Sequence, residues 1–321
     1  MPASFRSYGN LEQPSAVVLS QELADHRQTL GRMQSERGQY DPALIEVYDD
    51  LAGIYQQHGD FEKATANYQQ ALQLTRINFG LDSEQQLPFL GKLILCSLSL
   101  QDWQQADTQH QLQFYLKNRL YESTDIRYAE AVVELADWKI RSLRENLLGE
   151  GPRERGWKAE EISTIYRTGL ARVKDNPARN VAALALLYQG KSQADLAMAR
   201  TLAETPHQFF PGTVNPYVQQ QVCQNNGQGG RARQCTSVRR DNPLYPESQR
   251  DTRRNLVYRS ISELERSLEN LGRLLAQHPV ALADQRDSVL TEIHALQAEF
   301  REFKTHSFAA CCAQGTPLAH R

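Results

Sequence analysis

The 321-residue chain lacks the long apolar runs that membrane proteins need. No uninterrupted apolar stretch approaches the roughly 20 residues that cross a bilayer, and the opening MPASFRSYGN has no apolar core of the kind that a signal peptide requires. Hydrophobic residues make up 40% and charged residues 23%, which is enough for a real core and too polar for a membrane bundle. We therefore expect a protein without a membrane span, cytoplasmic by default.

Strand-like alternation and enzyme motifs are also scarce. Helical periodicity runs through most of the sequence instead, which predicts an all-α fold. There is no HExxH, GxSxG, P-loop or dinucleotide fingerprint, and the eight histidines are scattered without the spacing of metal ligands. We expect no catalytic residues, no cofactor and no metal site, and hence a protein that is not an enzyme.

Cysteine is rare, with five in the chain. Cys96 lies in an apolar stretch and is most simply a core residue. Cys223 and Cys235 bracket a Gly/Asn-rich loop of eleven residues, and a disulfide between them ranks above free thiols. A zinc site ranks far lower because no CxxC is present. An oxidised pair would favour an oxidising compartment such as the periplasm, with the true start upstream of the first residue.

Charge is unevenly distributed along the chain. The net charge is −2, yet residues 1–150 hold 13 basic and 21 acidic side chains, whereas residues 151–321 hold 23 and 17. The two halves therefore carry −8 and +6. Such asymmetry concerns partners and association rather than fold.

The basic half has one dense arginine segment, 231–259, with a local charge of +5. Its arginines are Arg231, Arg233, Arg239, Arg240, Arg250, Arg253, Arg254 and Arg259. Binding of RNA or another anion is one interpretation, because arginine forks suit phosphates. The favoured interpretation is a solvated surface paired with the acidic half, since no nucleic-acid-binding motif accompanies the arginines. Nucleic acid remains the alternative partner.

The segment 45–78 contains two amphipathic stretches joined by His-Gly-Asp. Seven residues of this segment share the spacing of the tetratricopeptide repeat (TPR) signature: Leu51, Ala52, Tyr55, Gly59, Ala64, Tyr68 and Ala71. A shift of 42 residues aligns GDFEKA with QDWQQA and gives a degenerate second copy, and a further 42 gives a third first-helix face. The segment thus resembles the longer repeats of kinesin light chain-like and bacterial TPR proteins. That resemblance implies an α-α superhelix, or solenoid, that acts as a scaffold for protein binding.

The domain organisation follows from these repeats. We predict an arm at 1–14 and a TPR-like solenoid at 15–205, then an irregular Pro/Gly/Arg-rich loop at 206–250, an antiparallel helical hairpin at 251–304 and a flexible tail at 305–321. Within the solenoid we expect a cap helix at 15–35, repeats near 45–78, 87–118 and 129–174, and a diverged helix pair at 180–204.

In TPR proteins the first helix of each repeat lines the concave surface, so the resemblance implies a partner site on those helices. The matching positions are Glu46, Asp49, Asp50, Gly53, Gln56 and Gln57 in copy one, Gly91, Lys92 and Leu95 in copy two, and Glu130, Val133, Glu134, Asp137 and Arg141 in copy three. Most of the charged positions are acidic, which predicts a protein or peptide partner of basic or mixed charge, or the chain's own arginine segment. The alternative is that these carboxylates only solvate an exposed face.

Overall fold

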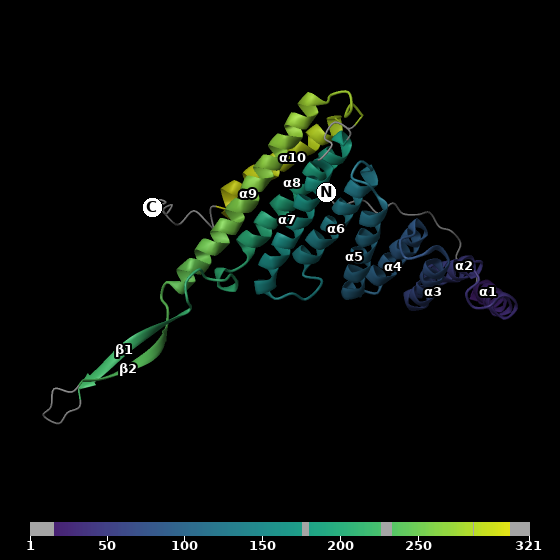
Figure 1. Cartoon of the computed structure of the whole chain (residues 1–321), viewed down its shortest axis with the longest axis horizontal. Coiled ribbons are helices and arrows are strands. Elements are labelled where there is room, and N and C mark those ends of the chain that lie inside the picture. The colour runs from purple at the N-terminus through teal and green to yellow at the C-terminus, as the bar shows by residue number, and fades with distance from the viewer. Residues whose placement is uncertain (1–15, 175–179, 226–232, 285, 309–321) are drawn as a thin grey trace. The chain divides into compact units, whose positions relative to one another are not determined.

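The computed structural model describes residues 16–174, 180–225, 233–284 and 286–308. These residues form ten α-helices, three short helical turns and one two-stranded sheet (Figure 1). The prediction of a predominantly helical fold is confirmed. The chain divides into two compact units, Met1–Leu120 and Tyr121–Arg321, which are described separately.

The first unit contains helices that pack on their neighbours in chain order. They are α1 (Ala16–Arg37), α2 (Leu44–Gln57), α3 (Phe61–Phe79), the short turn η1 (Glu84–Gln86), α4 (Leu87–Ser99) and α5 (Trp103–Leu120). The predicted cap helix corresponds to α1, and the predicted segments 45–78 and 87–118 correspond to the pairs α2–α3 and α4–α5. Helical periodicity was therefore sufficient to locate the five α-helices described in this unit.

The α2–α3 pair shows why the signature residues occur at their spacing. Gly59 has a φ of +75°, a left-handed conformation that favours glycine, and it lets the chain turn between the helices. Asp60 then caps α3, because its carboxylate accepts a hydrogen bond from the backbone N–H of Lys63 at 3.2 Å. The other six signature residues are buried together in one core cluster: Leu51, Ala52, Tyr55, Ala64, Tyr68 and Ala71.

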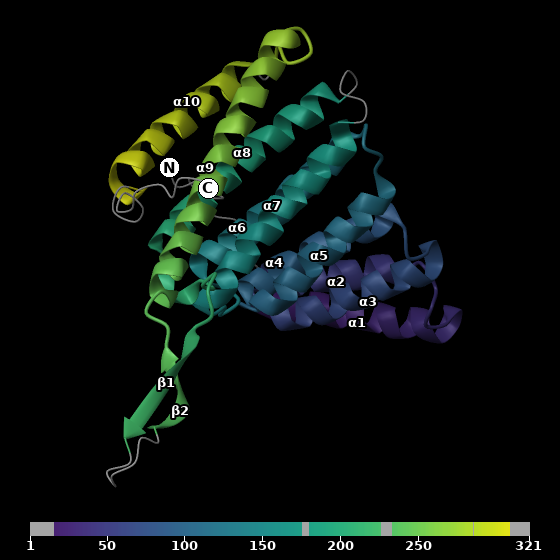
Figure 2. The same cartoon turned by 60° about the vertical axis from the view of Figure 1, so that its left-hand side comes forward.

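The second unit is organised around one long, largely buried helix. Its elements are α6 (Ile126–Glu145), α7 (Pro152–Lys174), α8 (Val181–Glu204), η2 (His207–Phe209), β1 (Tyr217–Asn225), β2 (Arg233–Asp241), α9 (Tyr245–Gln277), α10 (Arg286–Phe303) and the π-helical turn η3 (Lys304–Phe308). Helix α8 contacts α6, α7, α9 and α10 (Figures 1 and 2). Numerous alanines let these neighbours approach α8 closely.

The predicted helix pair at 180–204 is wrong, because α8 is one continuous helix. Gly190 has a helical backbone and lies against the ring of Tyr166 on α7, so the small residue serves close packing. The predicted segment 129–174 does form two helices, α6 and α7.

The predicted irregular loop at 206–250 is also wrong over most of its length. Strands β1 and β2 pair antiparallel, with Tyr217 opposite Asp241. Periodicity missed them because most side chains of the two strands are polar, so apolar and polar residues do not alternate. Asn242 closes the base: its backbone N–H donates to the Pro216 carbonyl at 2.8 Å and its side-chain amide donates to the Asn215 carbonyl at 2.7 Å.

The helical hairpin begins earlier than the predicted residue 251. Helix α9 starts at Tyr245 with Pro246 in its first turn. Proline is tolerated there because the backbone N–H that it lacks would have no partner within the helix. It ends at Gln277, just before His278-Pro279 as predicted. The chain then reverses direction into α10 (Figure 2), and both helices contact α8. The predicted arm at 1–14 and most of the tail at 305–321 lie outside the described residues.

Candidate functional site

In the first unit, the predicted partner-binding residues lie on α2 and α4. The structure brings two of them together, since Asp49 on α2 forms an ion pair with Lys92 on α4. The ammonium of Lys92 also lies 5.3 Å from the centre of the Tyr68 ring. The carbonyl of the Gln56 side chain accepts a hydrogen bond from the Tyr68 hydroxyl at 2.7 Å. Lys92 thus compensates the negative charge of Asp49, so the net negative charge of this face is smaller than the sequence predicts.

The remaining predicted residues of this unit make a more open surface. Glu46, Asp50 and Gln57 are exposed, whereas Gly53 and Gly91 are half-buried. Leu95 on α4 retains 54% exposure, which is high for a leucine. The surface therefore combines one exposed apolar side chain with flanking carboxylates and an internal ion pair.

In the second unit, the predicted residues lie on α6, and two of the five line a groove. Asp137 and Arg141 form part of a groove of about 460 Å³ between α6, α8 and α10. Glu130 and Glu134 are exposed elsewhere on α6, and Val133 is half-buried. The groove therefore includes the C-terminal part of the predicted α6 face.

The groove has an apolar floor and a charged rim. Leu196 on α8 and Leu296 on α10 are buried beneath it, with Ile140, Ala197 and Ala295 beside them. The remaining lining residues are Asp137, Arg141 and Arg144 on α6, Gln193 and Arg200 on α8, and Glu292 and Glu299 on α10. Three cations and three carboxylates thus surround an apolar centre.

Ion pairs and hydrogen bonds fix the rim. Arg200 pairs with Glu299 at 3.0 Å and joins α8 to α10, and Glu292 accepts hydrogen bonds from the amides of Gln189 and Gln193. Partial burial in the groove raises the pKa of Asp137, and the neighbouring Glu134 adds to the shift. Sequence analysis missed the residues on α8 and α10. Their spacing at 193, 196, 197 and 200, and at 292, 295, 296 and 299, places each set on one helical face.

A buried charge cluster on α8 was also missed. The ammonium of Lys191 lies 2.6 Å from the Asp195 carboxylate and 3.2 Å from that of Glu263 on α9. Burial raises the pKa of Asp195 to about 6, even though Lys191 opposes the shift. The same lysine lowers the pKa of Glu263 below its ordinary value, although partial burial of that carboxylate opposes the change. The sequence shows Lys191 and Asp195 only as an i,i+4 pair on one helix, and it does not reveal that α9 covers them.

The arginine segment does not form one patch within the described residues. Arg231 lies outside them, and only the backbone of Arg233 is described. Arg239 and Arg240 lie on β2, with the Arg239 guanidinium 3.5 Å from the centre of the Tyr217 ring. These two cations are exposed on the ribbon.

The other four arginines of the segment lie on α9 in different environments. Arg250 is exposed, whereas Arg253 is half-buried and donates to the Thr205 carbonyl at 3.3 Å. Arg254 pairs with Asp251, and Arg259 pairs with Glu160 on α7 at 3.3 Å. Three of the four thus have partners within the second unit.

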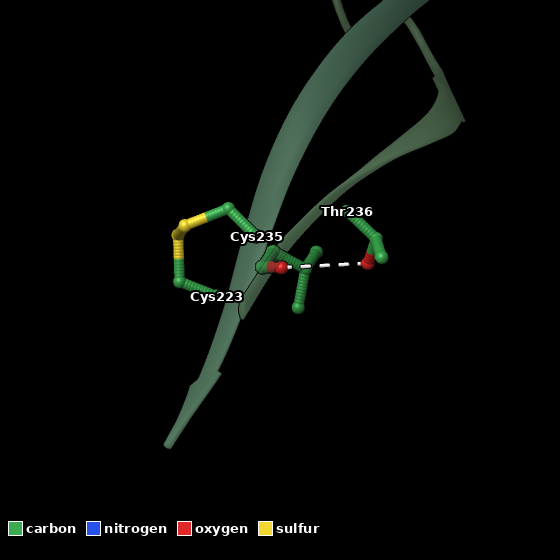
Figure 3. Close-up of a disulfide and its surroundings, with 4 residues drawn as sticks. Cys223, Cys235 and Thr236 are labelled. Carbon is green, nitrogen blue, oxygen red and sulfur yellow. Dashed lines mark hydrogen bonds between the residues drawn. A yellow bond between two sulfur atoms is a disulfide. The ribbon is translucent and has the colours of Figure 1, made fainter. Parts of the chain in front are cut away.

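Cys223 and Cys235 are cross-strand partners in the ribbon and form a disulfide. Figure 3 shows the disulfide on one side of the ribbon and Thr236 on the other, where its hydroxyl donates to the Val222 carbonyl at 3.5 Å. Cys96 is buried, as expected of a core residue, and burial raises the pKa of its thiol. The disulfide therefore holds the exposed ribbon together.

We predict that Cys223→Ser/Cys235→Ser loosens the ribbon without unfolding the helices. An isolated two-stranded ribbon is marginal in water, and closing a loop of this length contributes about 3 kcal/mol. Hydrogen exchange of the β1 and β2 amides should accelerate by at least about tenfold, while helical circular dichroism and the midpoint of thermal unfolding stay unchanged. Unchanged exchange in the two strands would contradict the stapling role.

Among the described residues, no group of three or more His, Cys, Asp or Glu side chains is placed to hold a metal ion. Within the same residues, no helix has the length and apolar character to cross a membrane.

No protein-family model matches the chain, and no curated protein matches it in sequence. The crystal structure of BtubC (BKLC) from P. vanneervenii aligns with 53% of this chain and 73% of its own, at 19% identity and a TM-score of 0.32. The class of the protein therefore rests on its own elements, which make it a predominantly helical protein with one disulfide-linked ribbon.

Proposed function

We propose that the chain is a non-catalytic, TPR-type interaction scaffold that binds a short peptide segment of mixed charge in the groove between α6, α8 and α10. The observation that carries the proposal is the groove itself, with its apolar floor and its rim of three cations and three carboxylates. Buried apolar anchors would supply most of the affinity, and the charged rim would select the partner's register.

The α2–α3 pair supports the TPR-type interpretation. Its signature residues pack as that class of repeat requires, with a glycine at the turn and small alanines at the helix contact. In the second unit, Asp137 and Arg141 of the third copy line the groove. The balanced rim favours a partner of mixed charge over a purely basic one, because each uncompensated like-charge contact would cost affinity.

A tryptophan placed in the groove should block binding. Ala295 lines the groove and is exposed, so Ala295→Trp fills the site without disturbing the core. Peptides would be selected on the full-length protein from a displayed random library, and their dissociation constants measured by fluorescence polarisation. We expect Ala295→Trp to weaken binding at least about tenfold, because one lost anchor typically costs more than 1 kcal/mol.

Ala298→Trp provides the matched control. Ala298 lies on the same helix and is equally exposed, but it does not line the groove. The Ala298→Trp variant should bind the selected peptides with the affinity of the wild type. Equal binding by Ala295→Trp, or the absence of any selected peptide, would contradict the proposal. If Ala295→Trp alone weakens peptide binding, co-purification from the native host would identify the natural partner.

A further inference from the structure

A second groove lies between α7 and α9, on the opposite face of α8 from the first. Its volume is about 330 Å³. It is lined by Ser163, Arg167, Leu170, Ala171 and Lys174 on α7, Tyr188 and Lys191 on α8, and Arg259, Glu263, Arg266, Ser267 and Asn270 on α9. The α8 residues of the two grooves differ by about half a turn, because 188 and 191 project away from 193, 196 and 200 at 3.6 residues per turn.

This second groove has a net positive charge. Five cations line it against one carboxylate, Glu263, which Lys191 holds at 3.2 Å and Arg266 at 3.1 Å. Glu160 pairs with both Arg167 and Arg259, at 3.0 Å and 3.3 Å, and bridges α7 to α9. With Asp195 included, five cations meet three carboxylates. The groove therefore keeps a net charge of +2.

The cations form two facing rows. Arg167 and Lys174 are seven residues apart on α7, and Arg259 and Arg266 are seven apart on α9, so each pair spans about 10 Å along its helix. Lys174 lies 5.4 Å from the centre of the Tyr188 ring. Such an arrangement offers donors to more than one anionic group at once.

Neutral donors and an apolar wall complete the groove. Ser163, Ser267 and Asn270 supply hydroxyl and amide groups, and Leu170 and Tyr188 supply apolar surface. Arginine forks bind phosphate oxygens in a bidentate manner, and lysine adds a point charge. The size falls within the range of pockets that accept small organic ligands.

We propose that the groove between α7 and α9 binds a small organic polyphosphate, a compact anion with at least two phosphate groups. The rows on α7 and α9 contact the phosphates, and the wall formed by Leu170, Ala171 and Tyr188 contacts the organic part. This site is distinct from the peptide groove, because the two share no lining residue.

Isothermal titration calorimetry on the full chain tests the proposal, with ATP, pyrophosphate and orthophosphate as probes at low salt. We expect ATP and pyrophosphate to bind and orthophosphate to bind at least about tenfold more weakly, since it reaches only one end of the rows. Arg167→Glu and Arg266→Glu should each weaken ATP binding about tenfold or more, because a hydrogen bond to a charged group is lost and a repulsive charge is introduced.

Arg301→Glu is the control for charge alone. Arg301 is exposed on α10 and lines neither groove, so the variant should bind ATP like the wild type. Circular dichroism checks the fold of each variant. If a charge reversal does not fold, Lys174→Gln at the exposed Lys174 gives the same test with a smaller change.

Three outcomes would overturn the proposal. The first is no binding of ATP or pyrophosphate at millimolar concentration. The second is weakening of ATP binding by Arg301→Glu to the same extent as by Arg167→Glu. The third is tight, salt-sensitive binding of single-stranded RNA that requires Arg167 and Arg266, with no binding of ATP, which would define a polynucleotide site instead.

Discussion

Lys191→Met is expected to lower the free energy of unfolding by about 3–5 kcal/mol at pH 8 and by clearly less at pH 5. Lys191 is 5% exposed and is the cation that compensates the buried carboxylate of Asp195. Methionine fills similar volume and removes the charge, so the variant leaves an uncompensated carboxylate in the protein interior. Urea unfolding at the two pH values measures the difference.

The sign of the pH dependence follows from the pKa of Asp195. In the folded protein that pKa is raised to about 6, above the ordinary value near 4. The folded state therefore holds the proton more tightly, and stability falls as pH rises between those values. Loss of Lys191 moves the folded pKa still higher and extends this fall toward neutral pH. Glu263 has the opposite dependence, because Lys191 lowers its folded pKa and the resulting stabilisation is lost as pH falls. Removing Lys191 removes this high-pH stabilisation, so it also makes the cost of Lys191→Met larger at pH 8 than at pH 5.

The double variant Lys191→Met/Asp195→Asn separates charge from packing. With no ionisable group at 195, the cost of Lys191→Met should become nearly independent of pH between 5 and 8, apart from the contribution of Glu263. A cost of equal size at both pH values in the single variant would show that Lys191 acts through packing instead.

Gly190→Ala is expected to destabilise the protein by about 2 kcal/mol, although the same change in an ordinary helix interior stabilises by up to about 1 kcal/mol. A Cβ at this position would lie 2.6 Å from the hydroxyl oxygen of Tyr166 and 3.2 Å from two of its ring carbons. Tyr166 is fully buried, so its ring has little room to move. Unfolding in urea gives the cost.

Tyr166→Phe should rescue part of this loss. Burial raises the pKa of Tyr166 well above its ordinary value, and its hydroxyl has no hydrogen-bond partner among the described residues. Removing the hydroxyl alone should be neutral or slightly stabilising. In combination with Gly190→Ala it removes the closest contact, and the double-mutant cycle should give a coupling of about 1 kcal/mol or more. Additive effects would contradict the proposed contact.

Local patterns in the sequence predicted much of the helical structure. Apolar spacing located α1 to α7, and the proline at 279 marked the end of α9. Such features succeed because each depends on a few neighbouring residues. The ribbon was not predicted, since its polar strands are specified by pairing across the Cys223–Cys235 bridge rather than by an apolar face.

The site was predicted only in part, for a similar reason. Asp137 and Arg141 followed from the helical face of α6, but Arg200 and Glu299 come from helices that meet α6 only in the folded chain. The prediction of a helix pair at 180–204 divided α8, which is one continuous helix, and hid its continuous faces. The buried Lys191–Asp195 pair looked like an ordinary surface pair, because its burial depends on the distant helix α9.

Helix α8 gives the second unit a shared wall with a different groove on each side. A displacement or stiffening of this helix would alter both grooves together, whichever one caused it. Thermodynamic linkage then requires that occupancy of either groove changes the affinity of the other by the same factor. The two ligands would thus report on each other, and titrating one in the presence of the other would measure how rigidly α8 couples them.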